Sequence, residues 1–445
     1  MASSHEERKA RLIDELAAGA GALGLRKDTS NLFRNREEGK KRRLDVRPFH
    51  HVLEVNPREG WADVEGMTTY EDLVAATLPH AVMPAVVPQL KTITIGGAAA
   101  GVGIEASSFR YGLVHETLLE MEILTAAGEI VLARPDNEHR DLYFGFPNSY
   151  GSLGYALRLK VMTLPILPFV QAEHVRCGDA RTFFRELAET CRGDAHFVDG
   201  VVFAPDELYL TVGRFTREAP FTSDYTYENI YYRSIRDKRV DFLTTSGYIW
   251  RWDTDWFWCS DNFHAQNPLI RRMLGRHRLN SRTYTQIMRW NSRWRVTDLL
   301  DRLSGWRREP VIQDVDIPLE RAPAFLDFFH REIGILPIWV CPFRAYDPNV
   351  RYDLYPVSPD RLYVNFGFWD VVRRREAFPP GHFNRLVERE VARLDGIKSL
   401  YSDSYYDPDM FWSIYDRGGA YRRLKAKYDP EGILGDLYDK CVLRR

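Results

Sequence analysis

The sequence predicts an α+β fold of two domains, followed by a C-terminal segment that returns to the first domain. A chain of 445 residues is too long for one compact core. Up to Pro165, strand patterns alternate with short helices and Gly-containing turns, whereas after Pro168 the composition shifts toward aromatic residues. We therefore expect domains at residues 1–165 and 166–395, and the returning segment at residues 396–445.

The elements expected in the first domain follow from apolar spacing and turn signals. Leu12, Ile13 and Leu16 share one face of a helix expected over residues 5–24. Thr68 or Thr69 is the expected N-cap of a second helix, which Glu71 favours with early negative charge. The remaining expected elements are strands at 52–55 and 61–64, a hairpin over 118–132 and a strand over 155–164.

The second domain is expected to contain an antiparallel sheet. Trp250, Trp252, Trp256 and Trp258 alternate along the chain, which would place them on one face of a strand with Asp253 and Asp255 solvated on the other. Core packing and an apolar channel for a lipid chain are both open readings of this face. A strand pair at 335–343 and 361–369 and a helix over 382–394 complete the expected elements.

Composition excludes several classes of partner. The net charge is −1, so no overall field draws the chain to nucleic acid. The five cysteines are scattered and form no C-x-x-C pair, which argues against a disulfide framework or a zinc site and favours a reducing, cytoplasmic compartment. No run of 18 apolar residues occurs, so we expect at most peripheral contact with the inner face of a membrane. The oligomeric state is not fixed by the sequence.

Four glycines lie close together at positions 96, 97, 101 and 103, with only Ala and Val between them. Such a stretch lets the backbone approach a ligand and allows amide groups to converge on a pyrophosphate. A tight structural loop is an equal alternative on spacing alone. The order of the glycines departs from the Rossmann fingerprint, and no Gly-Lys-Ser/Thr follows as in a Walker A loop.

The glycine stretch, with residues 111–113, 122–128 and 151–154, resembles the FAD-binding domain of the vanillyl-alcohol oxidase (p-cresol methylhydroxylase, PCMH-type) superfamily. Further blocks resemble its delta-24-sterol reductase branch, above all Pro-Ile-Trp-Val-Cys-Pro-Phe at 337–343 and Leu-Tyr-Ser-Asp-Ser-Tyr at 400–405. This resemblance implies a two-subdomain FAD-binding domain and an α+β cap, or substrate, domain with an antiparallel sheet.

The resemblance also implies which residues contact the cofactor. Superfamily members with covalent flavin use a His in the first diphosphate loop, and the matching residues 28–33 contain neither His nor Cys. We therefore expect FAD to be held non-covalently. The cofactor-binding residues that the resemblance implies are Ser30, Asn31, Ile95, Gly96, Gly97, Ala98, Gly101, Val102, Gly103, Ile104, Ser107, Ser108, Gly112, Gly154, Ala156 and Leu157.

The implied chemistry is hydride transfer from the flavin to a carbon–carbon double bond, with NADPH as the electron donor. An isolated alkene is electron-rich, so a proton must be delivered as the hydride arrives. Candidate catalytic residues are Tyr401, Asp403, Tyr405, Tyr406 and Cys341. Aromatic packing is an equal reading for the 401–406 block, and a small buried hydrophobe is the commoner role for such a cysteine.

Two lipid substrates fit this chemistry. One is a sterol side-chain alkene, and the other is a methylene-branched fatty acyl chain, as in actinobacterial 10-methylene fatty acyl reductases that act after a lipid methyltransferase. The Arg-rich, Lys-poor composition points to a GC-rich bacterial genome, and sterol synthesis is rare in bacteria. We therefore favour the fatty acyl chain as the substrate. The superfamily also includes FAD-dependent oxidases and dehydrogenases of alcohols or sugars, and a non-catalytic flavoprotein is a third possibility.

Overall fold

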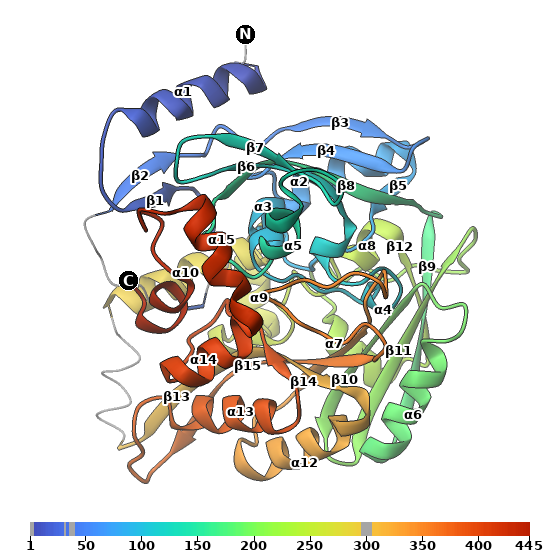
Figure 1. Ribbon diagram of the computed structural model, residues 1–445. Coiled ribbons are helices and arrows are strands. Elements are labelled where there is room, and N and C mark those ends of the chain that lie inside the picture. Colours follow the sequence, from blue (N-terminus) through green and yellow to red (C-terminus); the bar gives the residue numbers. More distant parts are fainter. Residues whose placement is uncertain (1–3, 31–32, 35–40, 295–304) are drawn as a thin grey trace.

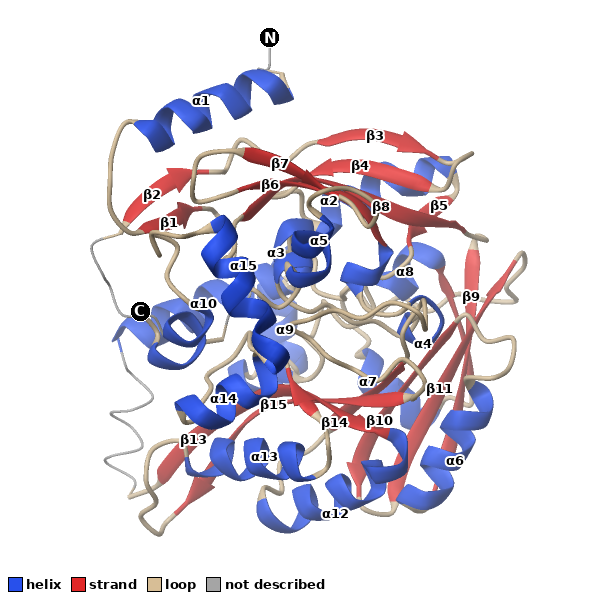
Figure 2. Ribbon diagram, viewed as in Figure 1, coloured by secondary structure: helices blue, strands red, loops and turns tan. Residues whose placement is uncertain are grey.

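The computed structural model describes residues 4–30, 33–34, 41–294 and 305–445, and its two large sheets confirm the α+β class (Figures 1 and 2). The first sheet has the order β3-β4-β8-β6-β7, and β5 pairs with β8 outside that path. Its strands are β3 (Val52–Asn56), β4 (Trp61–Glu65), β5 (Val82–Pro84), β6 (Leu118–Leu124), β7 (Ile130–Ala133) and β8 (Tyr155–Pro165). All of its pairs are antiparallel.

The second sheet has eight antiparallel strands in the order β12-β9-β11-β10-β14-β15-β13-β16. Its strands are β9 (Phe169–Cys177), β10 (Phe197–Ala204), β11 (Glu207–Thr216), β12 (Val240–Thr244), β13 (Arg307–Pro318), β14 (Ile338–Phe343), β15 (Tyr363–Arg374) and β16 (Ile397–Lys398). Helices α6 (Ala180–Thr190), α12 (Ala322–Glu332) and α13 (His382–Arg393) cover the outer face of this sheet (Figure 2). The inner face therefore points toward the first domain.

The space between the two sheets holds short helices and loops, which Figure 1 shows below the first sheet. These helices are α2 (Tyr70–Thr77), α3 (Ile95–Ala100), α4 (Ser108–Tyr111), α5 (Arg140–Gly145), α7 (Tyr231–Asp237), α8 (Thr245–Ile249), α9 (Pro268–Leu274) and α10 (Ser281–Trp294). Within the described residues, no helix is long and apolar enough to cross a membrane.

Segments from both ends of the chain meet beside the first sheet. Strand β1 (Leu23–Arg26) pairs in parallel with β2 (Arg42–Asp45), and the Leu23 amide donates to the Ile433 carbonyl at 2.8 Å. Helices α14 (Pro408–Tyr415) and α15 (Ala420–Tyr428) run from the second sheet up to the first domain (Figure 1). The Lys425 ammonium there donates to the Ser152 carbonyl at 2.8 Å.

Most elements of the first domain fall where the sequence predicts them, including the hairpin, the strand from Tyr155 and the helix capped by Thr69. The expected helix over residues 5–24 is shorter, because α1 (His5–Ala17) ends before the glycines at positions 19 and 21. Gly21 has a positive φ of 104°, which is outside the helical region.

The expected strand over the four tryptophans is wrong. Trp256 and Phe257 have positive φ values of 45° and 63°, which break an extended chain. Asp253 and Asp255 are buried and not solvated, being 1% and 3% exposed. Each has a distant partner that sequence spacing does not show: Asp253 accepts from the Lys91 amide at 2.9 Å, and Asp255 pairs with Arg271 at 2.6 Å.

Helix α1 is attached to the first sheet by charged side chains. His5 Nδ1 lies 2.7 Å from Glu65 Oε1, and His5 Nε2 lies 3.3 Å from Glu122 Oε2. Burial favours the neutral imidazole, but hydrogen bonds and charge from Glu122 and Glu65 outweigh it and raise the pKa of His5 to about 9. Burial is likewise outweighed at Glu65, where hydrogen bonds from His5 and Arg8 lower the pKa to about 2.

These shifts predict that the attachment of α1 weakens at high pH. The charged imidazole of His5 stabilises the attachment fully when the pH is below 6.5, the ordinary pKa of histidine. This stabilisation is lost as the pH rises through about 9, where His5 gives up its proton in the folded protein. One pKa unit corresponds to about 1.4 kcal/mol, so the loss is on the order of 3 kcal/mol. Hydrogen exchange of the α1 amides at pH 6 and pH 10 should show this loss of protection. In a His5→Gln variant the difference between the two pH values should disappear, and an unchanged difference would contradict the assignment.

Candidate functional site

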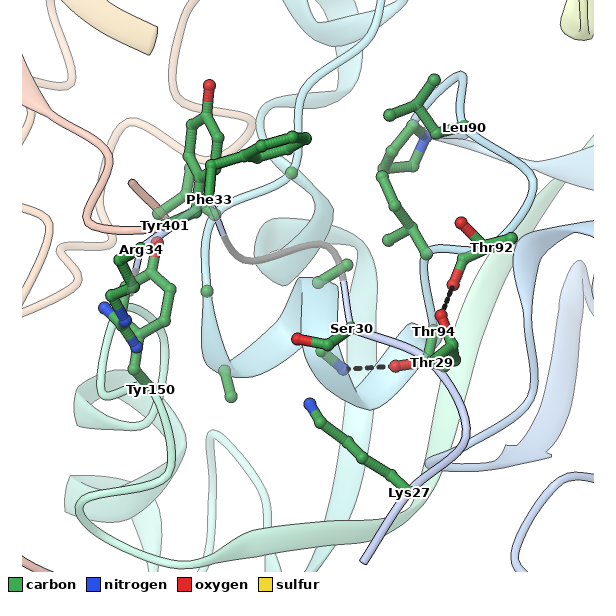
Figure 3. Close-up of a pocket in the computed structure, with 18 of the residues that line it drawn as sticks. Lys27, Thr29, Ser30, Phe33, Arg34, Leu90, Thr92, Thr94, Tyr150 and Tyr401 are labelled. Atoms are coloured by element: carbon green, nitrogen blue, oxygen red, sulfur yellow. Dashed lines mark hydrogen bonds between the residues drawn. The ribbon is translucent and has the colours of Figure 1, made fainter. Parts of the chain in front are cut away.

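A single cavity of about 940 Å³ is bounded by both domains and by the C-terminal segment. The first domain contributes α3 and the start of β8, and the second contributes the inner face of β13 and β15. Tyr401 and Lys440 from the C-terminal segment complete the wall. Figure 3 shows part of it, with Tyr401, Phe33, Arg34 and Tyr150 along one side of the cavity.

The floor of the cavity is built from glycines that touch one another through their backbones. The Gly96 amide donates to the Gly66 carbonyl at 2.9 Å, and the Gly66 amide donates to the Leu157 carbonyl at 2.8 Å. A Cβ on Gly96 would lie 2.6 Å from the Gly66 oxygen, and one on Gly66 would lie 2.0 Å from the Ala156 oxygen. Only glycine therefore fits at both positions.

The glycine stretch begins with a short helix and not with a loop. The Gly97 amide donates to the Thr94 hydroxyl at 3.2 Å, which caps α3 at its first turn (Figure 3). Thr29 donates to the Thr92 carbonyl at 2.9 Å and ties the N-terminal segment to this turn (Figure 3). Neither alternative drawn from the glycine spacing includes this helix, which forms because Thr94 supplies a cap and the Ala run after it favours a helix.

Most residues expected to contact the cofactor line this cavity. Those lining it are Ser30, Gly96, Gly97, Ala98, Gly101, Val102, Gly103, Ile104, Gly154, Ala156 and Leu157. The structure places Ile95, Ser107, Ser108 and Gly112 away from the wall, and Asn31 is outside the described residues.

The four residues away from the wall have structural positions. Ile95 is 1% exposed within the core, and Ser107 donates its hydroxyl proton to the Ala85 carbonyl at 2.7 Å. The Ser108 hydroxyl accepts from the Glu105 amide at 3.1 Å. Gly112 ends α4 with a positive φ of 70°. They shape the segment after the floor without facing the cavity.

Cations gather at the end of the cavity near the C-terminal segment. Lys440 donates to the Gly151 carbonyl at 2.6 Å, and its pKa lies well below the usual value because burial, Lys425 and Lys41 all disfavour its charge. Figure 3 shows Lys27 extending from the N-terminal segment toward Ser30. A bound anion would stabilise these cations together. Glycines that have no room for a side chain let the backbone approach a ligand closely, and such cations attract an anion. Together these two features fit the diphosphate of FAD.

The opposite wall of the cavity is aromatic. Phe257 and Trp369 have ring centroids 4.4 Å apart, and the Trp369 indole donates to the Tyr401 hydroxyl at 2.8 Å. Trp339 lines the same wall, and its indole donates to buried Asp199 at 3.2 Å. This wall can hold an apolar ligand beside the glycine floor.

Asp314 on β13 lies within this aromatic wall. Burial and the charge of Asp316 raise the pKa of its carboxyl to about 7, although hydrogen bonding from Tyr401 and Trp369 acts in the other direction. Asp314 is not among the residues predicted from the sequence. The signal that points to it is its place in Val-Ile-Gln-Asp at 311–314, a further block that resembles the delta-24-sterol reductase branch.

Of the five candidate catalytic residues, the structure places Tyr401 alone on the cavity wall. Asp403 lies 3.4 Å from the Arg444 guanidinium. Tyr405 packs against Gly381, and Tyr406 is 4% exposed beside Tyr415 and Phe411. Cys341 is fully buried, which raises the pKa of its thiol well above the usual value.

Comparison with known proteins agrees with this geometry. Residues 26–134, which include α3 and the whole glycine floor around Gly96, match the family described as FAD binding domain. This chain carries an FAD-binding domain. Its relatives include the Delta(24)-sterol reductases of Arabidopsis thaliana and Homo sapiens, each 26% identical to it. These alignments cover 89% and 87% of this chain and 76% and 75% of the relatives.

Another relative is Cytokinin dehydrogenase 6 of Oryza sativa subsp. japonica. It is 27% identical over 84% of this chain and 72% of that protein. Because the alignments with the Delta(24)-sterol reductases cover 89% and 87% of this chain, that similarity extends through the second domain and is not limited to residues 26–134.

Proposed function

We propose that the protein is an FAD-dependent reductase of a carbon–carbon double bond in a lipid. The observation that carries the proposal is that one cavity joins the glycine floor of the FAD-binding domain to an aromatic wall of the second sheet. The relatives named Delta(24)-sterol reductase support the reaction class. FAD, once bound and reduced, would supply the hydride.

The chain's own residues would hold FAD without a covalent bond. The floor formed by Gly66 and Gly96 would lie under the dinucleotide, with Lys440 and Ser30 near its diphosphate. The aromatic wall would exclude water from the reacting carbons and keep the alkene beside the flavin. These roles rest on the cavity lining and on the glycine contacts.

The shape of the wall supports a chain-like substrate. Asp314, Ile312, Pro310 and Arg308 alternate along β13 on the face that lines the cavity, and Arg308 is opposite Arg373 on β15. Six residues of strand span about 20 Å. We propose that the alkene lies near Asp314, that the apolar chain follows Ile312 and Pro310, and that an anionic head group lies near the two arginines.

This arrangement favours a methylene-branched fatty acyl chain of an anionic phospholipid over a sterol, whose polar end is neutral. A lipid methyltransferase acting earlier would supply such a methylene group. NADPH is the electron donor that we propose. The alternative is an FAD-dependent oxidase or dehydrogenase of an alcohol or a sugar.

An anaerobic experiment tests the proposal. NADPH should bleach the yellow holoenzyme, and a methylene-branched anionic phospholipid should then restore the flavin absorbance. A sterol alkene should restore it much more slowly. Reduction of the flavin by an alcohol or sugar, with no response to NADPH, would overturn the proposal in favour of the alternative.

The head-group assignment has its own variant. Arg373→Glu should raise the KM for the anionic lipid by roughly tenfold, since the wrong charge now faces the head group, and leave kcat nearly unchanged. Arg239→Glu is the control, because Arg239 is an exposed arginine on the far edge of the second sheet, next to β12. Equal effects of the two substitutions would contradict the assignment.

A further inference from the structure

Asp314 occupies a position that the fold keeps open toward the cavity. In the register of β13 and β15 it is opposite Gly367. A Cβ on Gly367 would lie 2.7 Å from Asp314 Oδ1 and 2.6 Å from the Trp369 ring. Any larger residue at 367 would therefore displace both groups, and glycine leaves room for the carboxyl oxygen and the Trp369 ring at these positions.

The two oxygens of this carboxyl differ in their surroundings. Among the described residues, Oδ1 is buried and has no hydrogen-bond partner, although the residue as a whole borders the cavity. Tyr401 lies near enough to the carboxyl to influence its pKa, and the Tyr401 hydroxyl accepts a hydrogen bond from the Trp369 indole at 2.8 Å. A buried polar atom without a partner costs free energy, which is why such atoms often mark functional positions.

The charged and titratable groups around Asp314 favour its protonated form. Burial disfavours the carboxylate most, the charge of Asp316 on the same strand adds to this effect, and together they outweigh the opposing influence of Tyr401 and Trp369. The cations that we assign to the cofactor and the head group do not contribute to its shift. With a pKa of about 7, the carboxyl is protonated in a large fraction of molecules near neutral pH, whereas burial raises the pKa of Tyr401 well above its usual value and makes Tyr401 the weaker acid.

We propose that Asp314 is the catalytic acid that gives the proton to the alkene. This inference rests on the proposed function. The π electrons of the alkene form the new C–H bond with the Asp314 proton, and the other carbon accepts a hydride from the reduced flavin. The alkene gains two electrons and the flavin loses two. Asp314 is left as a carboxylate and recovers a proton from the solvent through the cavity.

The same wall stabilises the charge that develops during this step. Protonation leaves partial positive charge on the more substituted carbon before the hydride arrives. Trp369, Phe257 and Trp339 line the same cavity as Asp314, and the face of an aromatic ring attracts such charge. Asp314 therefore supplies the proton, and the aromatic rings stabilise the positive charge that develops when the proton is transferred.

Asp314→Asn tests the assignment, since it keeps the shape of the side chain and removes the acid. The holoenzyme is reduced anaerobically with dithionite, so that the result does not depend on NADPH, and is then mixed with the methylene-branched phospholipid. We expect reoxidation by the lipid to slow by roughly 10²-fold or more, because general acid catalysis contributes about 10²–10⁴-fold. Reoxidation by O₂ should be unchanged.

Three comparisons make the result specific. Asp370→Asn changes another carboxylate on the cavity wall and should slow the step less than threefold. Asp314→Glu should recover part of the rate. In the wild type the rate should fall as the pH rises through about 7, and this fall should be absent in Asp314→Asn.

The outcomes separate the two claims. If the reduced wild-type enzyme is reoxidised by no lipid alkene, the proposed function fails and this assignment fails with it. If the wild type reacts and Asp314→Asn reacts within threefold of it with the same pH profile, only the assignment of Asp314 is overturned. Loss of FAD from Asp314→Asn would be resolved by Asp314→Glu and by the wild-type pH profile.

Discussion

A Gly96→Val variant should purify with less than about a tenth of the FAD held by the wild type. The new Cβ would lie 2.6 Å from the Gly66 oxygen and 3.1 Å from the Gly66 Cα, and neither backbone atom can rotate away. Helix α3 must then move off the floor into the space that we assign to the cofactor. Overpacking of this kind costs about 1–3 kcal/mol. The flavin-to-protein absorbance ratio after gel filtration measures the result.

Gly178→Val is the matched control for this variant, because a Cβ on Gly178 meets nothing within 4 Å. It should retain FAD fully. Circular dichroism and thermal unfolding of the Gly96 variant separate loss of the site from loss of the fold. Lys440→Ala adds no volume and should weaken FAD binding by roughly tenfold through the loss of the ammonium group and of its hydrogen bond to the Gly151 carbonyl. Stoichiometric FAD in the Gly96 variant would refute the proposed floor.

Arg251→Met should destabilise the protein by about 3–5 kcal/mol. The Arg251 side chain is fully buried, and it lies 2.9 Å from Asp199 in the second domain and 3.4 Å from Glu105 in the first. Burial raises the pKa of Glu105 to about 7, and Arg251 opposes that shift. Removing the guanidinium leaves two buried carboxyls without their cation. The midpoint of denaturant unfolding measures the loss.

Two comparisons assign this loss to the buried pair. Arg239→Met removes an arginine that is 86% exposed and lies 3.9 Å from Glu173, so it should change stability by less than about 1 kcal/mol. Adding Asp199→Asn to Arg251→Met should recover part of the loss, because one buried charge is then removed as well. An Arg251 variant as stable as the Arg239 variant would show that the pair does not hold the domains together.

Local signals predicted much of the first domain. The hairpin at 118–132 and the strand from Tyr155 are bounded by residues such as Gly and Pro that favour turns. Thr69 is a strong helix cap. The glycine stretch, which the sequence predicts to approach a ligand, lines the cavity. Its helical start at Ile95 was missed because glycine spacing received more weight than the cap at Thr94.

The second domain shows what local patterns omit. Alternating tryptophans predicted a strand, but burial of Asp253 and Asp255 depends on Lys91 and Arg271, which are distant in the sequence or in another element. Asp314 was missed for the same reason. Its chemistry depends on its pairing with Gly367 and on Tyr401, and no spacing within 311–314 encodes these neighbours.

The cavity wall also constrains when the protein can first hold its cofactor during synthesis. Residues near the N-terminus pair with the segment beyond Leu400: Phe33 bridges Ser402, and the Arg34 guanidinium donates to the Leu400 carbonyl at 2.6 Å. A nascent chain can therefore form the glycine floor only after Leu157 has emerged, and it cannot close the cavity until the C-terminal segment leaves the ribosome. We therefore expect each chain to bind FAD stably only after its synthesis is complete.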